Sequence, residues 1–244
     1  MKIYKTGIMG LGMGTAWAKA AHLLENTKLT MVYDPNYEKN PRIEREFYEN
    51  SGAIIAKSED VIYKAGLDII IVASPDHFHS GQSVKALNSG ANVICEKPLA
   101  PTVADCKKII RAVKQSGKFF MTGQVCRYAP GFILAKRLVD EGRIGAIAFI
   151  ESEYAHDYTM AFGYNNWRKD PKIKREGIIG GGCHAMDLVR WMAGNPREVC
   201  CYTNRTLLAD CDWPTDDTGI IIAKFPNNVI GKIFVSVGVK GPIQ

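Results

Sequence analysis

The sequence predicts an α/β protein with two domains, in which a doubly wound parallel sheet is followed by an α+β domain with a mostly antiparallel open sheet. Three observations support this fold class. Short apolar strands alternate with helical segments in the first half of the chain. A glycine-rich loop joins the first strand to the first helix. Two apolar strands on either side of "PNN" predict a hairpin near residue 227.

The first half contains five apolar segments that are typical of buried parallel strands: residues 6–9, 29–34, 67–74, 91–96 and 118–123. Helical spacing between the strands predicts helices over residues 61–66, 81–90 and 103–117. These three helices end in Gly66, Gly90 and Gly117, as expected for a glycine C-cap. The alternation of strands and helices predicts a parallel sheet that is covered on both faces.

The second half has a different pattern. Helices are expected over 132–142 and 184–194, a long strand over 146–158, and hairpin strands over 218–225 and 229–237. We place the boundary so that the domains comprise residues 1–123 and 124–244. Because the chain stops just after a strand, we expect the natural protein to continue and the second sheet to be incomplete.

Composition excludes several classes of protein. Hydrophobic content is 46% and charged content 23%, as in ordinary globular proteins, and no apolar run is long enough to span a membrane. The net charge of +6 is spread along the chain, so no nucleic-acid partner is expected. The first residues lack a secretion signal, and the seven cysteines form no C-x-x-C pair. We therefore expect reduced thiols and a cytoplasmic location.

The loop "GIMGLGMGTAW" resembles a dinucleotide-binding fingerprint with one departure. Gly10 and Gly12 supply the G-x-G, whereas the third glycine would fall at Thr15 and Gly14 comes one residue early. Small residues here, with Met13 between them, allow a pyrophosphate to approach the amides at the start of a helix. The alternative is a tight turn between strand and helix that binds no ligand.

Asp34 ends the second predicted strand, twenty-two residues after Gly12. A carboxylate at this distance accepts hydrogen bonds from an adenosine ribose and repels a 2′-phosphate. The sequence therefore favours NAD over NADP. The alternative is that Asp34 only forms the turn before Pro35.

Two loops, "VASPDHFHS" and "CEKPLAPT", follow neighbouring strands, and ligands of open α/β sheets bind beyond the carboxyl ends of the strands. Lys97 is then expected near the nicotinamide, where its ammonium donates to a substrate oxygen. The alternative is a surface salt bridge or a charge pair with Glu96. The residues of the two loops that we expect at the cofactor are Ser74, Pro75, His79, Glu96 and Lys97.

These elements, in this order, resemble the Gfo/Idh/MocA oxidoreductase family, which includes glucose–fructose oxidoreductase and inositol dehydrogenases. The stretches that carry the resemblance are the glycine loop, Asp34, "SPDHFH", "EKP", "QVCRYAP", "NWRKD" and "GGGCHAMDLVRW". The resemblance covers essentially the whole chain. It implies an NAD-binding Rossmann domain over 1–123 and a substrate-binding and oligomerisation domain over 124–244.

The resemblance also implies a catalytic constellation of the lysine of E-K-P with an aspartate and a histidine spaced D-x-x-x-H. The lysine corresponds to Lys97 and the histidine to His184, whereas the aspartate corresponds to Gly180. From its sequence position alone, His184 is also suited to capping a helix. Asp187 is predicted on the same helix face as His184, where it either orients the imidazole or pairs with Arg190.

Tyr128, Asp157 and Trp167 are further candidates for substrate contact, because loops and strand ends of the second domain are expected to line the cleft. Tyr128 and Trp167 are equally suited to simple packing. Cys183 lies beside His184, but no Cys or His pair has the spacing of metal ligands, so no metal is expected.

The sequence therefore predicts an oxidoreductase that transfers a hydride between NAD and a secondary hydroxyl of a sugar, inositol or related polyol. His184 would take the hydroxyl proton, directly or through water, while Lys97 polarises the oxygen. Two alternatives remain open: a glycosidase that uses bound NAD for transient oxidation, and a non-catalytic nucleotide-sensing regulator, which Gly180 favours. We expect no membrane partner, and the resemblance implies a homo-oligomer, a dimer or tetramer, in the full-length protein.

Overall fold

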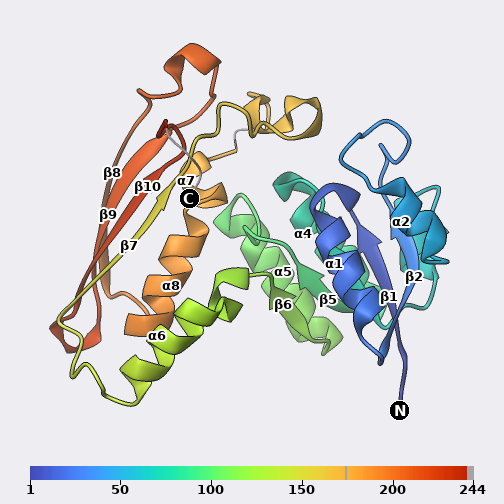
Figure 1. Ribbon diagram of the computed structural model, residues 1–244, viewed down its shortest axis with the longest axis horizontal. Helices are drawn as coiled ribbons and strands as arrows, with labels where there is room; N and C mark the ends of the chain where they lie inside the picture. Colours follow the sequence, from blue (N-terminus) through green and yellow to red (C-terminus); the bar gives the residue numbers. More distant parts are fainter. Residues whose placement is uncertain (174, 241–244) are drawn as a thin grey trace. The chain divides into compact units, whose positions relative to one another are not determined.

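The computed structural model describes residues 1–173 and 175–240, and the chain divides into two compact units (Figure 1). We call Met1–Gly123 the N-terminal unit and Gln124–Gln244 the C-terminal unit. Each contains its own sheet and its own apolar core.

The N-terminal unit is built on a six-stranded parallel sheet with strand order β3-β2-β1-β4-β5-β6. This order reverses direction between β1 and β4, which is the switch point of a Rossmann fold. The strands are β1 Tyr4–Met9, β2 Thr27–Tyr33, β3 Ile54–Ile55, β4 Ile69–Val72, β5 Asn92–Cys95 and β6 Phe120–Thr122. The helices are α1 Leu11–Leu23, α2 Arg45–Asn50, α3 Glu59–Lys64, α4 His79–Asn88 and α5 Val103–Ser116, with the 3₁₀ turn η1 Asp76–Phe78.

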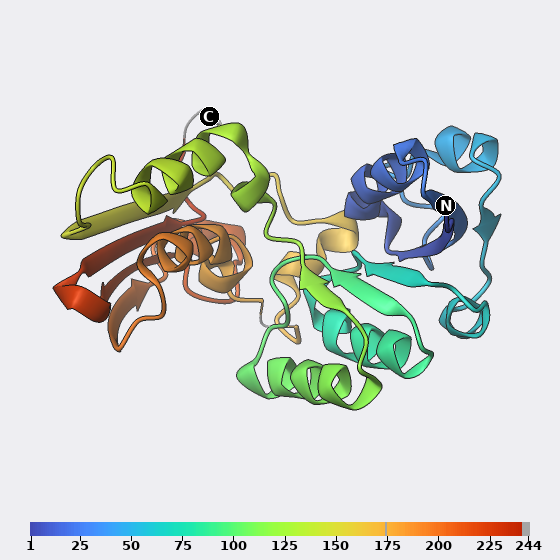
Figure 2. The same ribbon diagram turned by 90° about the horizontal axis from the view of Figure 1, so that it is seen from below.

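Helices cover both faces of this sheet, and alternate strand residues supply the two cores. On one face, Met9, Ile70 and Val72 pack with residues of α4 and α5. On the other face, Ile8 and Ile71 pack with residues of α1 and α2. Figure 2 shows the two helical layers on either side of the sheet. The predicted doubly wound parallel sheet is confirmed.

The C-terminal unit has a four-stranded sheet with strand order β7-β10-β9-β8. Its strands are β7 Phe149–Ala155, β8 Glu198–Asn204, β9 Thr218–Lys224 and β10 Ile230–Ser236. Its helices are α6 Pro130–Asp140, α7 Gly177–Gly180 and α8 Cys183–Ala193, with the 3₁₀ turns η2 Val125–Tyr128, η3 Tyr164–Lys169, η4 Ala209–Cys211 and η5 Pro226–Asn228. Helix α8 packs against one face of the sheet, where Ala185 and Val189 meet Ile233 and Val235 (Figure 1).

Two of the three strand pairings are antiparallel, so the predicted mostly antiparallel sheet is confirmed. Strand β10 follows β9 through the expected hairpin. The sequence did not predict that β7 pairs with β10 in parallel. Along the chain, α8 and the strands β8 and β9 separate β7 from β10. No local pattern therefore joins these two strands.

The predicted strands run longer than the observed ones at the positions where the chain turns. Strand β4 ends at Val72 rather than at 74, because Ser74 bends against the glycine loop. Strand β7 spans Phe149–Ala155 rather than 146–158, and Asp157 then forms a bridge to Gly238. In the described part of the chain, no helix is long and apolar enough to cross a membrane.

Candidate functional site

The glycine loop brings α1 close to the end of β4. Gly10 has a φ of 85°, which disfavours other residues, and a Cβ there would lie 2.4 Å from the backbone nitrogen of Ser74. At Gly12 the nearest atom to such a Cβ is Asn40 Nδ2, 3.9 Å away, so that side of the loop is open. The loop thus leaves room for a ligand at Gly12 and none at Gly10.

Helix α1 begins with amides that have no partner inside the helix. The Leu11 amide donates to Asp34 Oδ2 at 2.9 Å. Within residues 1–173 and 175–240, no group accepts from the amides of Gly12 and Met13, and both residues are exposed. Two outward N–H groups at the positive end of a helix dipole suit a pyrophosphate, so these residues fit a dinucleotide.

The departure from the glycine fingerprint has a local explanation. A Cβ on Gly14 would lie 2.9 Å from Ile8, so Gly14 permits the close packing of α1 on β1 that the third glycine usually permits. The Thr15 hydroxyl donates to the Leu11 carbonyl at 2.6 Å and lies 3.0 Å from the Tyr48 hydroxyl. Burial raises the pKa of Tyr48 to about 12, so its hydroxyl keeps its proton and can donate to Thr15.

Asp34 follows β2 and is half-buried beside the loop. Its Oδ2 accepts from the Leu11 amide at 2.9 Å, and its Oδ1 accepts from the Asn36 amide at 2.8 Å. A carboxylate accepts about four hydrogen bonds, so acceptor positions remain on both oxygens for ribose hydroxyls. The turn role before Pro35 and the ligand role are therefore compatible.

His79 connects the loops that follow β4 and β5. The side chain is fully buried, with Nε2 2.8 Å from the Ser74 carbonyl and Nδ1 2.8 Å from the Pro98 carbonyl. The prediction that His79 contacts a cofactor is wrong for its side chain, because both ring nitrogens face main-chain carbonyls in the interior. Its role is to hold together the loops that carry Ser74, Pro75 and Lys97.

Glu96 and Lys97 follow β5 at the same edge of the sheet. Glu96 is buried, and its Oε1 accepts from the Trp17 indole at 2.7 Å while its Oε2 accepts from the Lys97 amide at 3.0 Å. Lys97 is half-buried. Ser74 lies after β4, where its hydroxyl donates to Gln82 at 2.5 Å. The sheet thus gathers Asp34, Ser74, Glu96 and Lys97 at its carboxyl edge.

In the C-terminal unit, His184 lies in the first turn of α8. Gly182 occupies the N-cap position and no side chain caps the helix, so the alternative of His184 as a cap does not apply. The imidazole lies 6.2 Å from the Tyr154 ring, centre to centre. Burial raises the pKa of Tyr154, whose hydroxyl is 2.9 Å from that of Tyr158, so this phenol stays protonated at neutral pH.

Gly180, which stands where the family pattern has an aspartate, is packed against Arg175. A Cβ on Gly180 would lie 2.2 Å from both the Cζ and an Nη of the Arg175 guanidinium. Arg175 is 4% exposed, and its guanidinium lies 6.0 Å from the Tyr158 ring and 5.5 Å from the Trp167 ring. A cation therefore occupies the space in which a side chain at position 180 would begin.

Asp187 pairs with Arg127 rather than with Arg190. Its Oδ2 accepts from Arg127 Nε and its Oδ1 from Arg127 Nη2, each at 2.6 Å. Arg190 donates instead to Asn195 at 2.6 Å. The hydrogen bonds to Asp187 raise the pKa of Arg127, and the pair joins η2 to α8. The predicted pairing with Arg190 is wrong, and the carboxylate is already held by a bidentate arginine.

The remaining candidates differ in their surroundings. Tyr128 is 70% exposed in η2. Asp157 accepts from both the amide and the hydroxyl of Thr159, at 2.8 and 2.6 Å, and these bonds lower its pKa. Trp167, in η3, packs beside Arg175. Trp167 thus lies beside the guanidinium that packs against Gly180.

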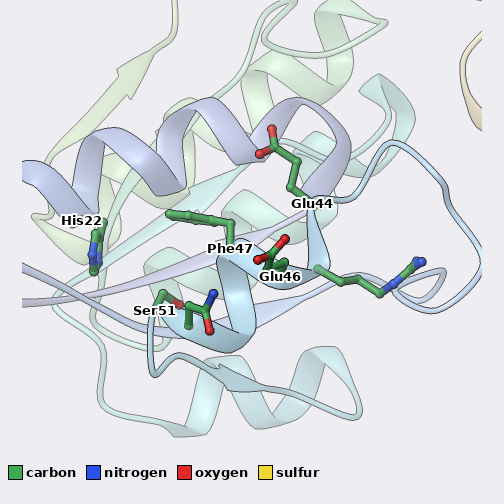
Figure 3. Close-up of a pocket in the computed structure, with 7 residues that line it drawn as sticks. His22, Glu44, Glu46, Phe47 and Ser51 are labelled. Atoms are coloured by element: carbon green, nitrogen blue, oxygen red, sulfur yellow. The ribbon is translucent and has the colours of Figure 1, made fainter.

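A separate pocket of about 490 Å³ lies between the end of α1 and α2 (Figure 3). Its lining comprises His22, Glu44, Arg45, Glu46, Phe47, Asn50 and Ser51. His22 is eleven residues after Leu11, which places it about 16 Å along α1 from the glycine loop. The pocket shares no residue with the site described above. Among the described residues, no group of three His, Cys, Asp or Glu could hold a metal ion.

Gly180→Ala is expected to lower the free energy of unfolding by about 1–3 kcal/mol, because the new methyl forces Arg175 from its place. Arg175→Met in the same chain should recover part of this loss. Gly131→Ala in α6, where a Cβ meets nothing within 4 Å, is the matched control. Urea unfolding measures all three, and equal losses at Gly180 and Gly131 would contradict the packing described.

Asp187→Asn should lower the free energy of unfolding by about 1–3 kcal/mol, since it weakens a pair of hydrogen bonds to a charged group. Arg190→Gln, which touches only an exposed contact, should cost less. Urea unfolding followed by tryptophan fluorescence compares the two. If Arg190→Gln proves the more destabilising change, the assignment of Asp187 to Arg127 fails.

Comparison with family models matches both units. Residues 4–124 match the oxidoreductase family model with an NAD-binding Rossmann fold, and residues 132–243 match the GFO/IDH/MocA C-terminal domain. Together these matches cover almost the whole chain.

Similar curated proteins come from several bacteria. An uncharacterized oxidoreductase of Streptococcus pneumoniae is 29% identical over 89% of this chain and 58% of its own length. The 2,7-anhydro-N-acetylneuraminate hydratase of Escherichia coli is 31% identical over 79% of this chain and 50% of its own. Inositol 2-dehydrogenase 2 of Saccharopolyspora erythraea is 30% identical over 73% of this chain and 51% of its own length. The chain therefore spans between half and three fifths of the length of these relatives.

Solved structures share the fold. GenD2 from gentamicin A biosynthesis, in complex with NAD, superposes with a TM-score of 0.85 at 22% identity, covering 99% of this chain and 68% of that chain. Myo-inositol 2-dehydrogenase from Lactobacillus plantarum superposes with a TM-score of 0.83 at 23% identity, covering 97% of this chain and 71% of that chain. With both of its units matched in order along the sequence, the chain belongs to the GFO/IDH/MocA oxidoreductase family.

Proposed function

We propose that this chain is the NAD-binding and catalytic part of an oxidoreductase that transfers a hydride between nicotinamide and a secondary hydroxyl of a sugar, inositol or related polyol. The observation that carries the proposal is the carboxyl edge of the parallel sheet. There the open amides of α1, the Asp34 carboxylate and Lys97 gather at the ends of three strands. The fold class alone would not select this chemistry.

The N-terminal unit binds the dinucleotide through its own residues. The amides of Gly12 and Met13 take the pyrophosphate, and Asp34 accepts the adenosine ribose hydroxyls. Asp34 favours NAD, because its negative charge repels a 2′-phosphate and because its hydrogen bond to Leu11 fixes the carboxylate. Ser74, Pro75, Glu96 and Lys97 lie towards the nicotinamide half. When bound, the nicotinamide supplies the hydride acceptor or donor.

Lys97 and His184 divide the proton chemistry between the two units. The Lys97 ammonium donates a hydrogen bond to the substrate oxygen, and His184 takes the hydroxyl proton, directly or through water. Arg175 brings a positive charge to the place of the family aspartate. Trp167 supports the substrate beside Arg175. Tyr128 and Asp157 are weaker candidates for the same role.

The names of relatives support the proposed substrate class. Two similar proteins are named inositol 2-dehydrogenases, and one from Pseudarthrobacter phenanthrenivorans, 28% identical, is named a levoglucosan dehydrogenase. These names concern ring compounds with secondary hydroxyls. We propose a substrate of that class, held by the domain over residues 124–244.

We also propose that the full-length protein is a cytoplasmic homo-oligomer that associates through the sheet face opposite α8. That face presents apolar side chains among charged ones. Those more than two fifths exposed are Phe149, Tyr202, Ile220, Ile222 and Ile230. An apolar area of this kind on a sheet supports burial against a second copy.

A second candidate is a reaction in which the nicotinamide is oxidised and reduced within one turnover. It is favoured by two relatives named 2,7-anhydro-N-acetylneuraminate hydratase, 31% and 29% identical, whose names describe no net oxidation. The two candidates differ in a measurable way. A dehydrogenase accumulates one NADH for each product, whereas the redox-neutral reaction accumulates none.

Asp34→Asn should lower the ratio of NAD affinity to NADP affinity by about tenfold or more. The asparagine side chain can still accept from the Leu11 amide, but it carries no negative charge to repel the 2′-phosphate. Calorimetry with both nucleotides measures the ratio. Asp68→Asn is the control. Asp68 also accepts from a main-chain amide, that of Lys5, but it lies just before β4, at the amino end of the strands. Equal or tighter binding of NADP by the wild type would refute the proposed cofactor.

Lys97→Met should lower turnover by about a hundred- to ten-thousandfold, the usual contribution of a positioned acid or base, and leave NAD affinity within a few-fold. Lys107→Met on exposed α5 is the control and should change neither. NADH absorbance with a panel of polyols and sugars measures the rate. A Lys97→Met chain with the wild-type rate on the substrate so identified would remove Lys97 from the mechanism.

A further inference from the structure

The side chain of Trp17 reaches the loop that follows β5. It lies in the second turn of α1, and its indole N–H donates to Glu96 Oε1 at 2.7 Å, across 79 residues of sequence. Glu96 is 9% exposed. A hydrogen bond from a neutral donor to a buried carboxylate is stronger than one between neutral groups and fixes the rotamer of the acid.

The second oxygen of Glu96 is fixed as well. Its Oε2 accepts from the amide of Lys97 at 3.0 Å. Gly123 leaves room for the pair, because a Cβ there would lie 3.2 Å from Trp17 Cζ2 and 3.5 Å from Glu96 Oε1. Since a carboxylate accepts about four hydrogen bonds, Glu96 keeps acceptor positions beyond these two.

The strand order gives this carboxylate its place along a dinucleotide. Asp34 follows β2 on one side of β1, whereas Glu96 follows β5 on the other side, beyond β4. A dinucleotide bound across the carboxyl edge has its adenosine at β2 and its nicotinamide riboside towards β4 and β5. Trp17, six residues into the helix that receives the pyrophosphate, therefore links the phosphate end of the site to the nicotinamide end.

We infer that Trp17 is a positioning residue for the nicotinamide half of the cofactor. Its indole N–H holds Glu96 so that the free acceptor positions of this carboxylate face the hydroxyls of the nicotinamide ribose. The inference rests on the proposed function. It adds a residue that lies beyond the glycines of the fingerprint and outside E-K-P. It predicts an effect on the nicotinamide half of the dinucleotide and none on the adenosine half.

Three ligands separate the halves of the cofactor. ADP contains the adenosine and pyrophosphate, ADP-ribose adds the second ribose, and NAD adds the nicotinamide ring. Calorimetry on the wild-type chain, Trp17→Phe and the control Trp191→Phe in α8 gives nine affinities. Phenylalanine keeps an aromatic ring at position 17 and removes the N–H donor, so the comparison isolates the hydrogen bond to Glu96.

Trp17→Phe should weaken NAD and ADP-ribose by about five- to thirtyfold and leave ADP within twofold, while Trp191→Phe leaves all three within twofold. Glu96→Ala should give the same selective loss, and the double variant should lose no more than Glu96→Ala alone, because both changes remove one unit. Equal weakening of all three ligands, or no change in any, would overturn the inference. A wild-type chain that binds none of the three would overturn the proposed nucleotide site itself, and this role with it.

Discussion

The hydrogen bond between the Asp34 carboxylate and the Leu11 amide fixes the geometry on which the rest of the nucleotide site depends. It joins the end of β2 to the start of α1, so the acidic group and the open amides of Gly12 and Met13 hold a constant separation. Gly10 closes the same corner against Ser74, because no Cβ fits between them. The ligand therefore meets a prearranged surface, and little conformational freedom is lost on binding.

The loops after β4 and β5 are held in a similar way. His79 bonds to the main chain of both, and Trp17 secures Glu96 beside Lys97. These contacts lie beside the residues that we propose to meet a ligand. The proposed role of Lys97 requires that the loop after β5 keeps a fixed position at the carboxyl edge of the sheet, and these interior contacts hold it there. A substitution at His79 or Trp17 is therefore expected to change the position of Lys97, because both side chains hold the loop that carries it.

The sequence predicts most of the N-terminal fold, because alternating apolar strands, glycine caps and the glycine loop are local signals. It also leads to Asp34 and Lys97, which stand directly after strands. It does not lead to Trp17, Arg127 or Arg175, since their partners lie 79, 60 and 5 residues away and no spacing rule joins them. The contact of Arg175 with Gly180 is close in sequence but depends on the path of the chain into α7. The parallel pairing of β7 with β10 was missed for a related reason, because it depends on where the chain returns after α8.

A crystal structure of the chain with NAD tests the account most directly. We expect the adenosine ribose hydroxyls on Asp34, the pyrophosphate on the amides of Gly12 and Met13, and the nicotinamide ribose on Glu96. A dinucleotide bound in the opposite direction, or in the pocket beside His22 and Phe47 (Figure 3), would contradict it.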